Sequence, residues 1–420
     1  MSILNVNKIN PVGGGSTITI AGIASVTSSV TAPSFVGDVT GAVTGNVTGN
    51  VTGNADTASG LSGNPSINTT GIVTATAFIP SQGQLSHRNI LINGAMNIAQ
   101  RYASSTSHPA YGADRWRFGF GNHSAGTVTA SQQSLSSSDT PYTLGFRKHI
   151  RIALGQAGTA ASNTYINLRH KIEAQDIAQC GWNYTSSSSF ITLQFWFRCS
   201  TNQTFYAELK SDDGTSQSFV FSFTASGNNT WTKITKTIPG NSNIQFDNDN
   251  GSGLGLWIYA YFGSGYTNNK TLDTWAPFDS SNYMPTMATT WLTAGASTWD
   301  VTGFQLEVGS VATPFEHRSF EEEEDRCMRY YEEGSFSFRA SGNIVRYCQA
   351  FNKRKRANPT MKVYYDSSKA TDGTINSGNS NNSGWSRGAT GKNAFNIEKN
   401  TGSNGNGVDF AGYYTAESEL

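Results

Sequence analysis

Aromatic side chains are the main chemical resource of this sequence. The chain of 420 residues contains nine Trp and 17 Tyr. A flat ring that faces solvent can stack on a sugar, while nearby Asn or Asp side chains hydrogen-bond the sugar hydroxyls. Four aromatic residues lie in segments rich in Gly, Ser, Asn and Thr, and we take them as candidate glycan contacts: Tyr266, Trp275, Trp291 and Trp385. Burial at a subunit interface is the alternative for all four. Trp196, Trp231 and Trp257 lie inside strand-like runs instead, where a core position is expected.

No arrangement of residues indicates catalysis. Glycoside hydrolysis needs two carboxylates placed across a sugar, and the sparse acidic residues of the central region show no spacing that pairs them. Motifs for a nucleophile elbow or a phosphate-binding loop do not occur. The six His residues lack the spacing of a zinc site, and the Asp247 and Asp249 turn lacks the Gly and Glu that complete a calcium loop. We therefore predict a protein that is not an enzyme and that has neither a metal site nor another cofactor.

The charge balance argues against nucleic acid and membranes as partners. The 29 basic and 29 acidic side chains cancel, and charged residues make up only 14% of the chain. Nucleic acid and anionic lipid are bound through clustered positive charge. The run of basic residues at 353–356 precedes an X-Pro turn, so we interpret it as a solvated strand end. No stretch of 18 apolar residues predicts a membrane span.

The cysteines and the first residues point to folding in a cytoplasm. The segment 1–15 does not have the pattern of a signal peptide. The four cysteines are scattered and form no C-x-x-C pair: Cys180, Cys199, Cys327 and Cys348. Free thiols are the favoured state, and a Cys180–Cys199 disulfide is the alternative that the sequence leaves open.

The elements that must position these side chains are mainly strands. The central region alternates apolar and polar residues in short runs separated by Gly, Asn, Asp and Ser, which favours antiparallel sheets. Its best strand candidates are 191–200, 204–211, 218–225, 230–238, 255–263 and 299–309. Asp213-Gly214 lies between two of them and is a strong hairpin signal. A two-sheet sandwich of the jelly-roll type is the architecture that this pattern predicts.

A helix is predicted directly after this region. Ser319 and Glu322 have capping-box spacing, and acidic residues fill the first turn. Glu322 with Arg326 and Asp325 with Arg329 are favourable i,i+4 pairs. We expect the helix to run over 319–334.

The predicted strands and helix divide the chain into four regions. The predicted fold class is all-β, with a repetitive β shaft at 1–85, a central jelly-roll sandwich at 86–318, a short connecting helix at 319–334 and a small β-sandwich at 335–420. Strand candidates in the last region are 343–351, 360–367 and 410–420.

Several segments together resemble a domain that recurs in bacteriophage tail-fibre and related virion proteins. These are "RNILINGAMNIAQR" (88–101), "ADRW" (113–116), "TIPGN" (237–241), "NDNGSGLGL" (248–256) and "FQLEVGSVATPFEHRSFEEEEDRCMRYY" (304–331). The closing "YYTAESEL" (413–420) is similar to the end of such fibre proteins, and "FVGDVTGAVTGNVTGN" with "GIVTATAF" is similar to the repetitive shafts of cyanophage structural proteins. The resemblance covers about 88–331 and implies a jelly roll like that of carbohydrate-binding modules. It supplies no sugar-binding residues.

The resemblance implies a homotrimer in the phage virion. We expect the N-terminal region to attach to other tail or virion proteins, and the β domains to recognise host cell-surface polysaccharide during adsorption. Assembly would take place in the host cytoplasm. The alternative is a purely structural fibre of the head, collar or whisker, without receptor binding. A glycan depolymerase is the least favoured hypothesis, because no catalytic signature accompanies the resemblance.

The repeat at 39–54 is the segment that most needs partner chains. In an extended strand Val39, Val43, Val47 and Val51 share one face with the intervening glycines, and Thr and Asn, with Ala42, occupy the other face, which is almost wholly polar. Valines of one chain then stand about 13 Å apart, which is too sparse to bury anything alone. Three chains around an axis could set Val against Gly. A disordered linker and a folded-back array of tight turns are the alternatives.

We expect the replacement of Val43, Val47 and Val51 by Ser to weaken trimers, because the change removes the apolar face of the repeat. The mass of the full chain in solution, measured by light scattering after size exclusion, checks this expectation. Unchanged assembly would leave the linker interpretation.

Overall fold

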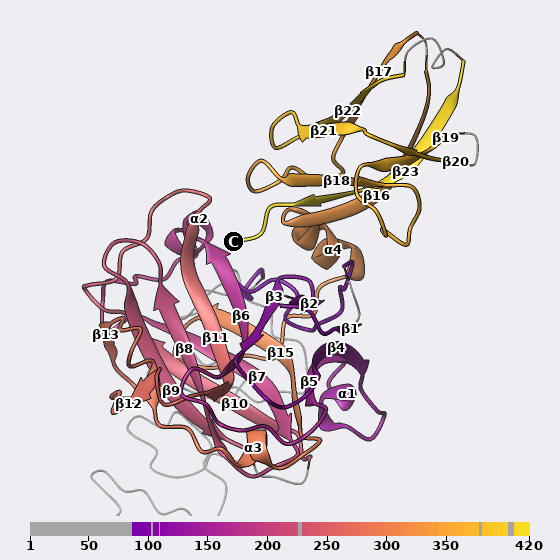
Figure 1. Cartoon of the computed structure of the whole chain (residues 1–420). Coiled ribbons are helices and arrows are strands. Elements are labelled where there is room, and N and C mark those ends of the chain that lie inside the picture. The colour runs from indigo at the N-terminus through magenta and orange to yellow at the C-terminus, as the bar shows by residue number, and fades with distance from the viewer. Residues whose placement is uncertain are drawn as a thin grey trace, which may run out of the picture. The chain divides into compact units, whose positions relative to one another are not determined.

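The computed structural model describes residues 86–101, 104–108, 110–225, 229–340, 342–377, 380–401 and 407–420. This part of the chain is built almost wholly of antiparallel β-sheets with a few short helices (Figure 1), which confirms the predicted all-β class. Two large hydrophobic cores are present, and each lies within its own sandwich. The predicted shaft segment 1–85, with Val39, Val43, Val47 and Val51, lies outside the described residues.

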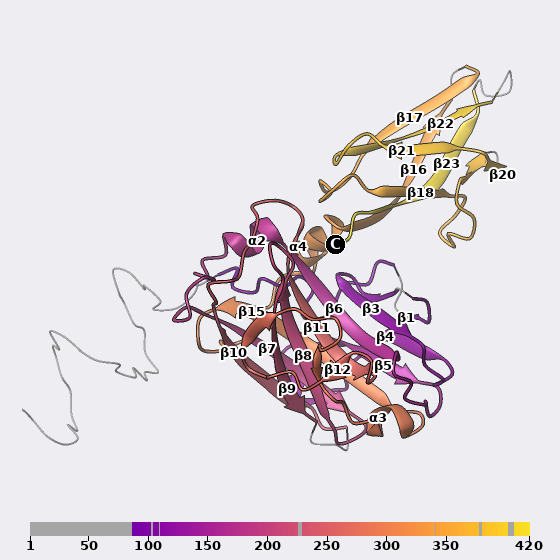
Figure 2. The same ribbon diagram turned by 60° about the vertical axis from the view of Figure 1, so that its left-hand side comes forward.

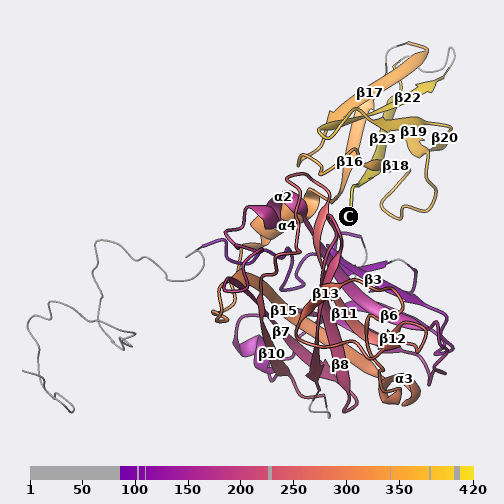
Figure 3. The same ribbon diagram turned by 90° about the vertical axis from the view of Figure 1, so that its left-hand side faces the viewer.

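The first sandwich consists of two large sheets, which Figures 2 and 3 show from two further directions. The seven-stranded sheet has the order β13 (Trp275–Pro277), β9 (Gln217–Thr224), β8 (Thr204–Ser211), β11 (Ser252–Phe262), β6 (Tyr165–Glu173), β3 (Trp116–Gly121) and β2 (Ala110–Ala113). The six-stranded sheet has the order β1 (Ser104–Ser105), β4 (Val128–Ser134), β5 (Lys148–Leu154), β15 (Thr298–Val308), β7 (Phe190–Cys199) and β10 (Thr232–Pro239). The short elements are α1 (Thr140–Thr143), α2 (Ala174–Ala178), α3 (Thr290–Thr293), and the parallel pair β12 (Thr267–Asn268) and β14 (Met284–Pro285).

The six strands predicted for the central region are all present, as β7, β8, β9, β10, β11 and β15, with ends within three residues of the predicted ones. The predicted hairpin joins β8 to β9, which pair in antiparallel fashion. Gly214 in this turn has a φ of 60°, a conformation that glycine adopts without steric cost. Period-2 alternation was therefore a sufficient guide to these strands.

Alternation along β6 shows how one sequence run serves both the core and the surface. Ile166 and Leu168 are fully buried in the core between the sheets. The residues between and after them, Asn167 and Arg169, therefore project from the opposite face of the sheet. This outer face carries the candidate site described below.

Three of the segments that resemble phage fibre domains, 88–101, 113–116 and 304–331, contact one another in the first sandwich. The Asn89 side chain donates to the Phe304 carbonyl at 2.9 Å and accepts from the Leu306 backbone N–H at 3.1 Å. The Trp116 indole N–H donates to the Asn93 carbonyl at 2.9 Å. These hydrogen bonds hold the segment 88–97 against β15 and β3. Residues that carry the resemblance therefore stabilise the fold.

The helix α4 (Phe320–Met328) begins at the predicted cap, where the Ser319 hydroxyl accepts from the Glu322 N–H at 3.2 Å. The helix is shorter than the predicted 319–334, because the chain enters the next strand at Tyr331. The Glu322–Arg326 pair forms at 3.0 Å. Arg329 instead makes two hydrogen bonds to Glu173, at 2.6 and 2.7 Å.

The second sandwich follows α4. One sheet has the order β16 (Tyr331–Arg339), β23 (Asp409–Glu417), β19 (Thr374–Ser377) and β20 (Ser380–Ser383), with β18 (Thr360–Tyr364) also paired to β23. The other sheet consists of β17 (Ile344–Ala350), β22 (Ala394–Asn400) and β21 (Ser386–Ala389). Aromatic and aliphatic side chains of both sheets, among them Phe395, Ile397 and Tyr414, form the core.

The basic run at 353–356 is only in part the solvated strand end that we expected, because Lys353 and Arg354 are exposed but Lys355 and Arg356 turn inward. Lys355 has no exposed surface and contacts the equally buried carboxylate of Glu332. The Arg356 Nε donates to the Ser418 carbonyl at 2.8 Å. Acceptors distant in sequence thus draw two of the four basic side chains inward, and only Lys353 forms an exposed ion pair, at 2.7 Å from Asp325.

Candidate functional site

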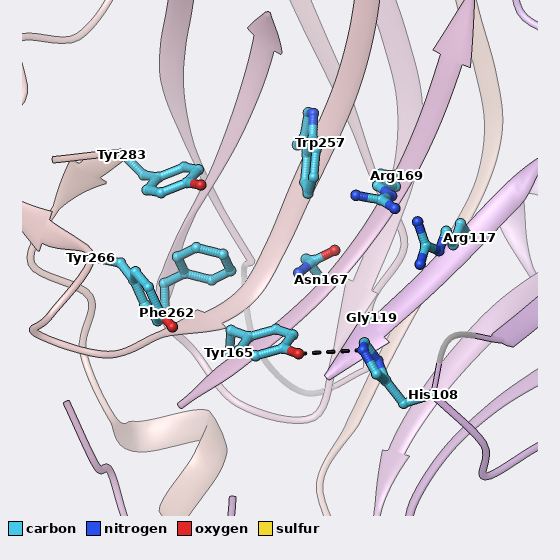
Figure 4. Close-up of a pocket in the computed structure, with 10 residues that line it drawn as sticks. All are labelled: His108, Arg117, Gly119, Tyr165, Asn167, Arg169, Trp257, Phe262, Tyr266 and Tyr283. Carbon is cyan, nitrogen blue, oxygen red and sulfur yellow. Dashed lines mark hydrogen bonds between the residues drawn. The ribbon is translucent and has the colours of Figure 1, made fainter. Parts of the chain in front are cut away.

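A cleft of about 280 Å³ lies on the outer face of the seven-stranded sheet (Figure 4). The residues that line it are His108, Arg117, Gly119, Tyr165, Asn167, Arg169, Trp257, Phe262, Tyr266 and Tyr283. Rings and a few polar groups around one concavity are the usual composition of a ligand site.

Strand pairing places the lining residues in adjoining rows. Arg117 on β3 lies directly opposite Arg169 on β6, and Gly119 lies opposite Asn167. On the other side of β6, Trp257 of β11 is the partner of Arg169. Because cross-strand partners stand about 5 Å apart, one row of side chains runs from Arg117 through Arg169 to Trp257.

Two glycines on β3 keep the floor of the cleft low. A Cβ atom at Gly121 would lie 2.7 Å from the Tyr165 ring, so only glycine leaves that ring its place. A Cβ atom at Gly119 would lie 3.2 Å from the Asn167 side-chain oxygen. The missing side chains therefore leave the Tyr165 ring and the Asn167 carboxamide open to the cleft.

Rings from β11 and the loop after it form the aromatic side of the cleft. The centroid of Phe262 is 5.2 Å from those of both Tyr266 and Tyr283. The Tyr283 N–H donates to the Tyr266 carbonyl at 2.8 Å, and the adjacent β12 and β14 pair with each other. The loop thus holds its two tyrosines in fixed positions, facing the Trp257 ring across the cleft (Figure 4).

The polar groups of the cleft have defined hydrogen-bonding roles. The Phe120 N–H donates to Nδ1 of His108 at 3.1 Å, so the proton of the neutral ring is on Nε2, which is 3.3 Å from the Tyr165 hydroxyl oxygen. Burial and the nearby positive charge of Arg117 lower the pKa of His108, which favours this neutral form. The Tyr165 hydroxyl can then accept from His108 and donate to a ligand. The Asn167 carboxamide makes no hydrogen bond within the described residues, and it offers a donor and an acceptor.

A buried carboxyl group lies beside Trp257, on the neighbouring strand. Glu208 on β8 is the cross-strand partner of Trp257 and has no exposed surface. It accepts a hydrogen bond from the Tyr259 hydroxyl. Burial raises the pKa of Glu208 from 4.5 to about 7, although the Tyr259 hydrogen bond and nearby lysines oppose this effect.

We expect the wild-type chain to lose stability as the pH rises, and we expect the Glu208→Gln variant not to show this loss. The pKa of this carboxyl is higher in the folded chain, so between pH 4.5 and 7 the folded state binds more protons than the unfolded state. Wild-type stability therefore falls through this window. Between pH 5 and 8 the free energy of unfolding of the variant should gain roughly 2 to 3 kcal/mol relative to wild type. Urea denaturation at both pH values measures this gain, and parallel pH profiles would refute the assignment.

The structure brings one of the four predicted aromatic contacts into the cleft, namely Tyr266. The exposure that we expected for the other three is wrong, because Trp275, Trp291 and Trp385 are only 8%, 0% and 2% exposed. Their indole N–H groups donate to the Pro239 carbonyl, the Thr298 carbonyl and the Asn382 side chain, at 2.7, 3.1 and 3.2 Å. An acceptor for each indole N–H allows the ring to enter a core, and for Trp275 this acceptor comes from a different segment, β10.

Sequence reasoning missed Trp257, which we had assigned to the core. Trp257 is only partly buried and lines the cleft. A signal was available, because in 256–259 Leu and Ile alternate with Trp and Tyr. The aliphatic residues of this run face the core, so Trp257 has to face outward.

The described residues contain no group of three or more His, Cys, Asp or Glu side chains placed to hold a metal ion. All four cysteines are free thiols, so the alternative Cys180–Cys199 disulfide does not form. In the part of the chain that the structure describes, no helix is long and apolar enough to cross a membrane.

Neither a protein-family model nor a curated protein matches this chain. Solved structures with a similar fold include the enzymatically active domain of bacteriophage CBA120 tailspike protein 4, at 9% identity and a TM-score of 0.27 over 53% of this chain. The match spans only 21% of that domain. A putative sugar-binding protein from Bacteroides thetaiotaomicron matches over its whole length and 53% of this chain, at 9% identity and a TM-score of 0.28. A family 11 carbohydrate-binding module from Clostridium thermocellum has a TM-score of 0.24 at 9% identity, over 50% of this chain and 98% of that module. Similarities this weak identify neither a family nor a ligand.

Proposed function

We propose that this chain binds a glycan in the cleft on the seven-stranded sheet. The observation that carries the proposal is the arrangement of the cleft itself, where the Trp257, Tyr266 and Tyr283 rings stand beside the Asn167 carboxamide and the Tyr165 hydroxyl. Rings can pack against the apolar faces of sugars, and the two polar groups match sugar hydroxyls as donors and acceptors.

The proposed role is binding without cleavage. The ten described residues that line the cleft include no Asp or Glu, whereas glycoside hydrolysis commonly uses two carboxyl groups facing the scissile bond. Glu208, the cross-strand partner of Trp257, has no exposed surface and is not among the residues that line the cleft. It is therefore placed to affect stability rather than to reach a substrate.

We further propose that the chain is a phage tail-fibre protein that recognises the host surface. The sequence resemblance at 88–331 supports this proposal, as does the repeat at 39–54, which suits a trimeric shaft. In this proposal the N-terminal region attaches to other virion proteins, and the cleft binds host polysaccharide during adsorption. A purely structural head, collar or whisker fibre would have no need of such a cleft.

A glycan array probed with the labelled full chain tests the binding function. We expect binding to bacterial surface polysaccharides, and equal binding by Tyr413→Ala, which removes a ring that is 38% exposed on β23 in the other sandwich. The absence of binding to any glycan would count against the receptor role.

Antibodies against the chain should label tail fibres in electron micrographs of the phage, whereas labelling of the head or collar would favour the structural alternative.

A further inference from the structure

Two arginines face each other at one end of the cleft. Arg117 and Arg169 are directly opposed in the pairing of β3 with β6, and both line the cavity. Figure 4 shows their guanidinium groups next to each other, away from the tyrosines. Like charges that are directly opposed across strands destabilise a sheet. The pair therefore lowers the stability of the sheet, and the fold alone gives no reason for it.

Neither arginine has an acidic partner, in contrast to the other basic residues of the same sheet face. Lys171 and Lys210 share the Asp212 carboxylate, at 2.9 and 3.1 Å. Within the described residues neither Arg117 nor Arg169 forms an ion pair or a side-chain hydrogen bond. Burial and Arg117 lower the pKa of His108, which therefore adds no further positive charge to this end. This end of the cleft is therefore positively charged and uncompensated.

The position of Arg169 over the Trp257 ring also suits the binding of a ligand. Its guanidinium carbon lies 4.7 Å from the centroid of the Trp257 ring. A guanidinium stacked on an aromatic ring keeps the N–H groups in its own plane free to donate. Two such groups side by side can bind the oxygens of a carboxylate, sulfate or phosphate through paired hydrogen bonds.

We propose that the cleft selects acidic glycans, with Arg117 and Arg169 binding an anionic substituent of a sugar whose ring packs against the aromatic side. The inference rests on the proposed glycan-binding function and narrows it to one substrate class. A uronic acid carboxylate is the substituent that best fits the two planar forks, and a sulfate or phosphate ester offers the same chemistry.

Matched pairs of oligosaccharides test this inference on the full chain. The probes are oligogalacturonate and its carboxyl-reduced form, together with a sulfated oligosaccharide and its desulfated form. We expect the wild-type chain to bind a charged member at least roughly tenfold more tightly than its neutral counterpart. The advantage should shrink as NaCl is raised. The carboxylate and sulfate pairs report which substituent is preferred.

Variants assign the effect to the two arginines. The double variant Arg117→Gln and Arg169→Gln should lose the preference for the charged member and still bind the neutral one. Arg117→Lys with Arg169→Lys should keep part of the preference. Arg339→Gln, which changes the charge at an exposed site in the other sandwich, should bind as wild type does, and thermal unfolding of all variants checks their folding.

The outcomes separate this inference from the proposed function. Equal binding of charged and neutral members by wild type would overturn the inference and leave glycan binding in place. A preference that survives in the double Gln variant would also overturn it. Failure to bind any glycan would overturn both.

Discussion

Replacement of Trp257 by alanine is expected to weaken glycan binding at least roughly 30-fold, or about 2 kcal/mol. The change removes a ring against which the sugar packs, and we take as a guide the stacking of a nucleic-acid base on an aromatic side chain, which is worth about 1 to 3 kcal/mol. It also removes the surface on which Arg169 rests, at 4.7 Å. Titration calorimetry of the full chain with a glycan chosen from the array measures the loss.

The control for this prediction is Tyr413→Ala, which deletes an exposed ring in the second sandwich and should leave the affinity unchanged. Because Trp257 is only partly buried, the alanine variant should remain folded, as far-UV circular dichroism can verify. An affinity within threefold of wild type would mean that the glycan does not use this cleft.

Replacement of Lys355 by alanine should lower the stability of the second sandwich by about 3 to 5 kcal/mol. Lys355 and Glu332 are both fully buried and in contact. The Glu332 carboxylate also accepts from the Tyr414 hydroxyl at 2.6 Å and from the Asn352 N–H at 2.9 Å. Without the lysine, the carboxylate would remain in the core with no cation to compensate its charge.

Lys353→Ala is a matched control for this loss, two residues away in the same basic run. Lys353 and its partner Asp325 are 45% and 49% exposed, so losing this pair should cost about 1 kcal/mol or less. Denaturant unfolding followed by a probe in the second sandwich measures both variants. A loss for Lys355→Ala no greater than that for Lys353→Ala would contradict a buried ion pair. Combining Lys355→Met with Glu332→Gln should recover part of the stability, because no charge is then left unpaired.

The fold could be predicted largely from local patterns. Strands such as β7 and β11 follow period-2 alternation, and the start of α4 follows the Ser319 cap, because these signals lie within a few neighbouring residues. Whether a side chain in a polar segment is buried or exposed depends instead on partners that are distant in sequence. Trp275 enters a core through an acceptor at Pro239, 36 residues away, while Lys355 meets Glu332 of β16, 23 residues away.

The candidate site was harder to predict than the fold. Tyr266 could be selected because its loop is polar and lies next to an aromatic strand. The cleft itself arises from strand order, since β3, β6 and β11 are neighbours in the sheet but are separated by long stretches of sequence. Nothing local indicates that Arg117 lies opposite Arg169, or that Gly119 and Gly121 leave the cleft open above Asn167 and Tyr165. The alternation in β11 did contain the information that Trp257 faces outward.

The most direct test of glycan binding in this cleft is a structure of the full chain with a bound oligosaccharide selected from the array. We expect a sugar ring packed against the aromatic side of the cleft, with hydroxyls within hydrogen-bond distance of Asn167 and Tyr165. We also expect an anionic substituent between Arg117 and Arg169. An oligosaccharide bound on any other surface, with the Trp257 cleft empty, would contradict the proposed function.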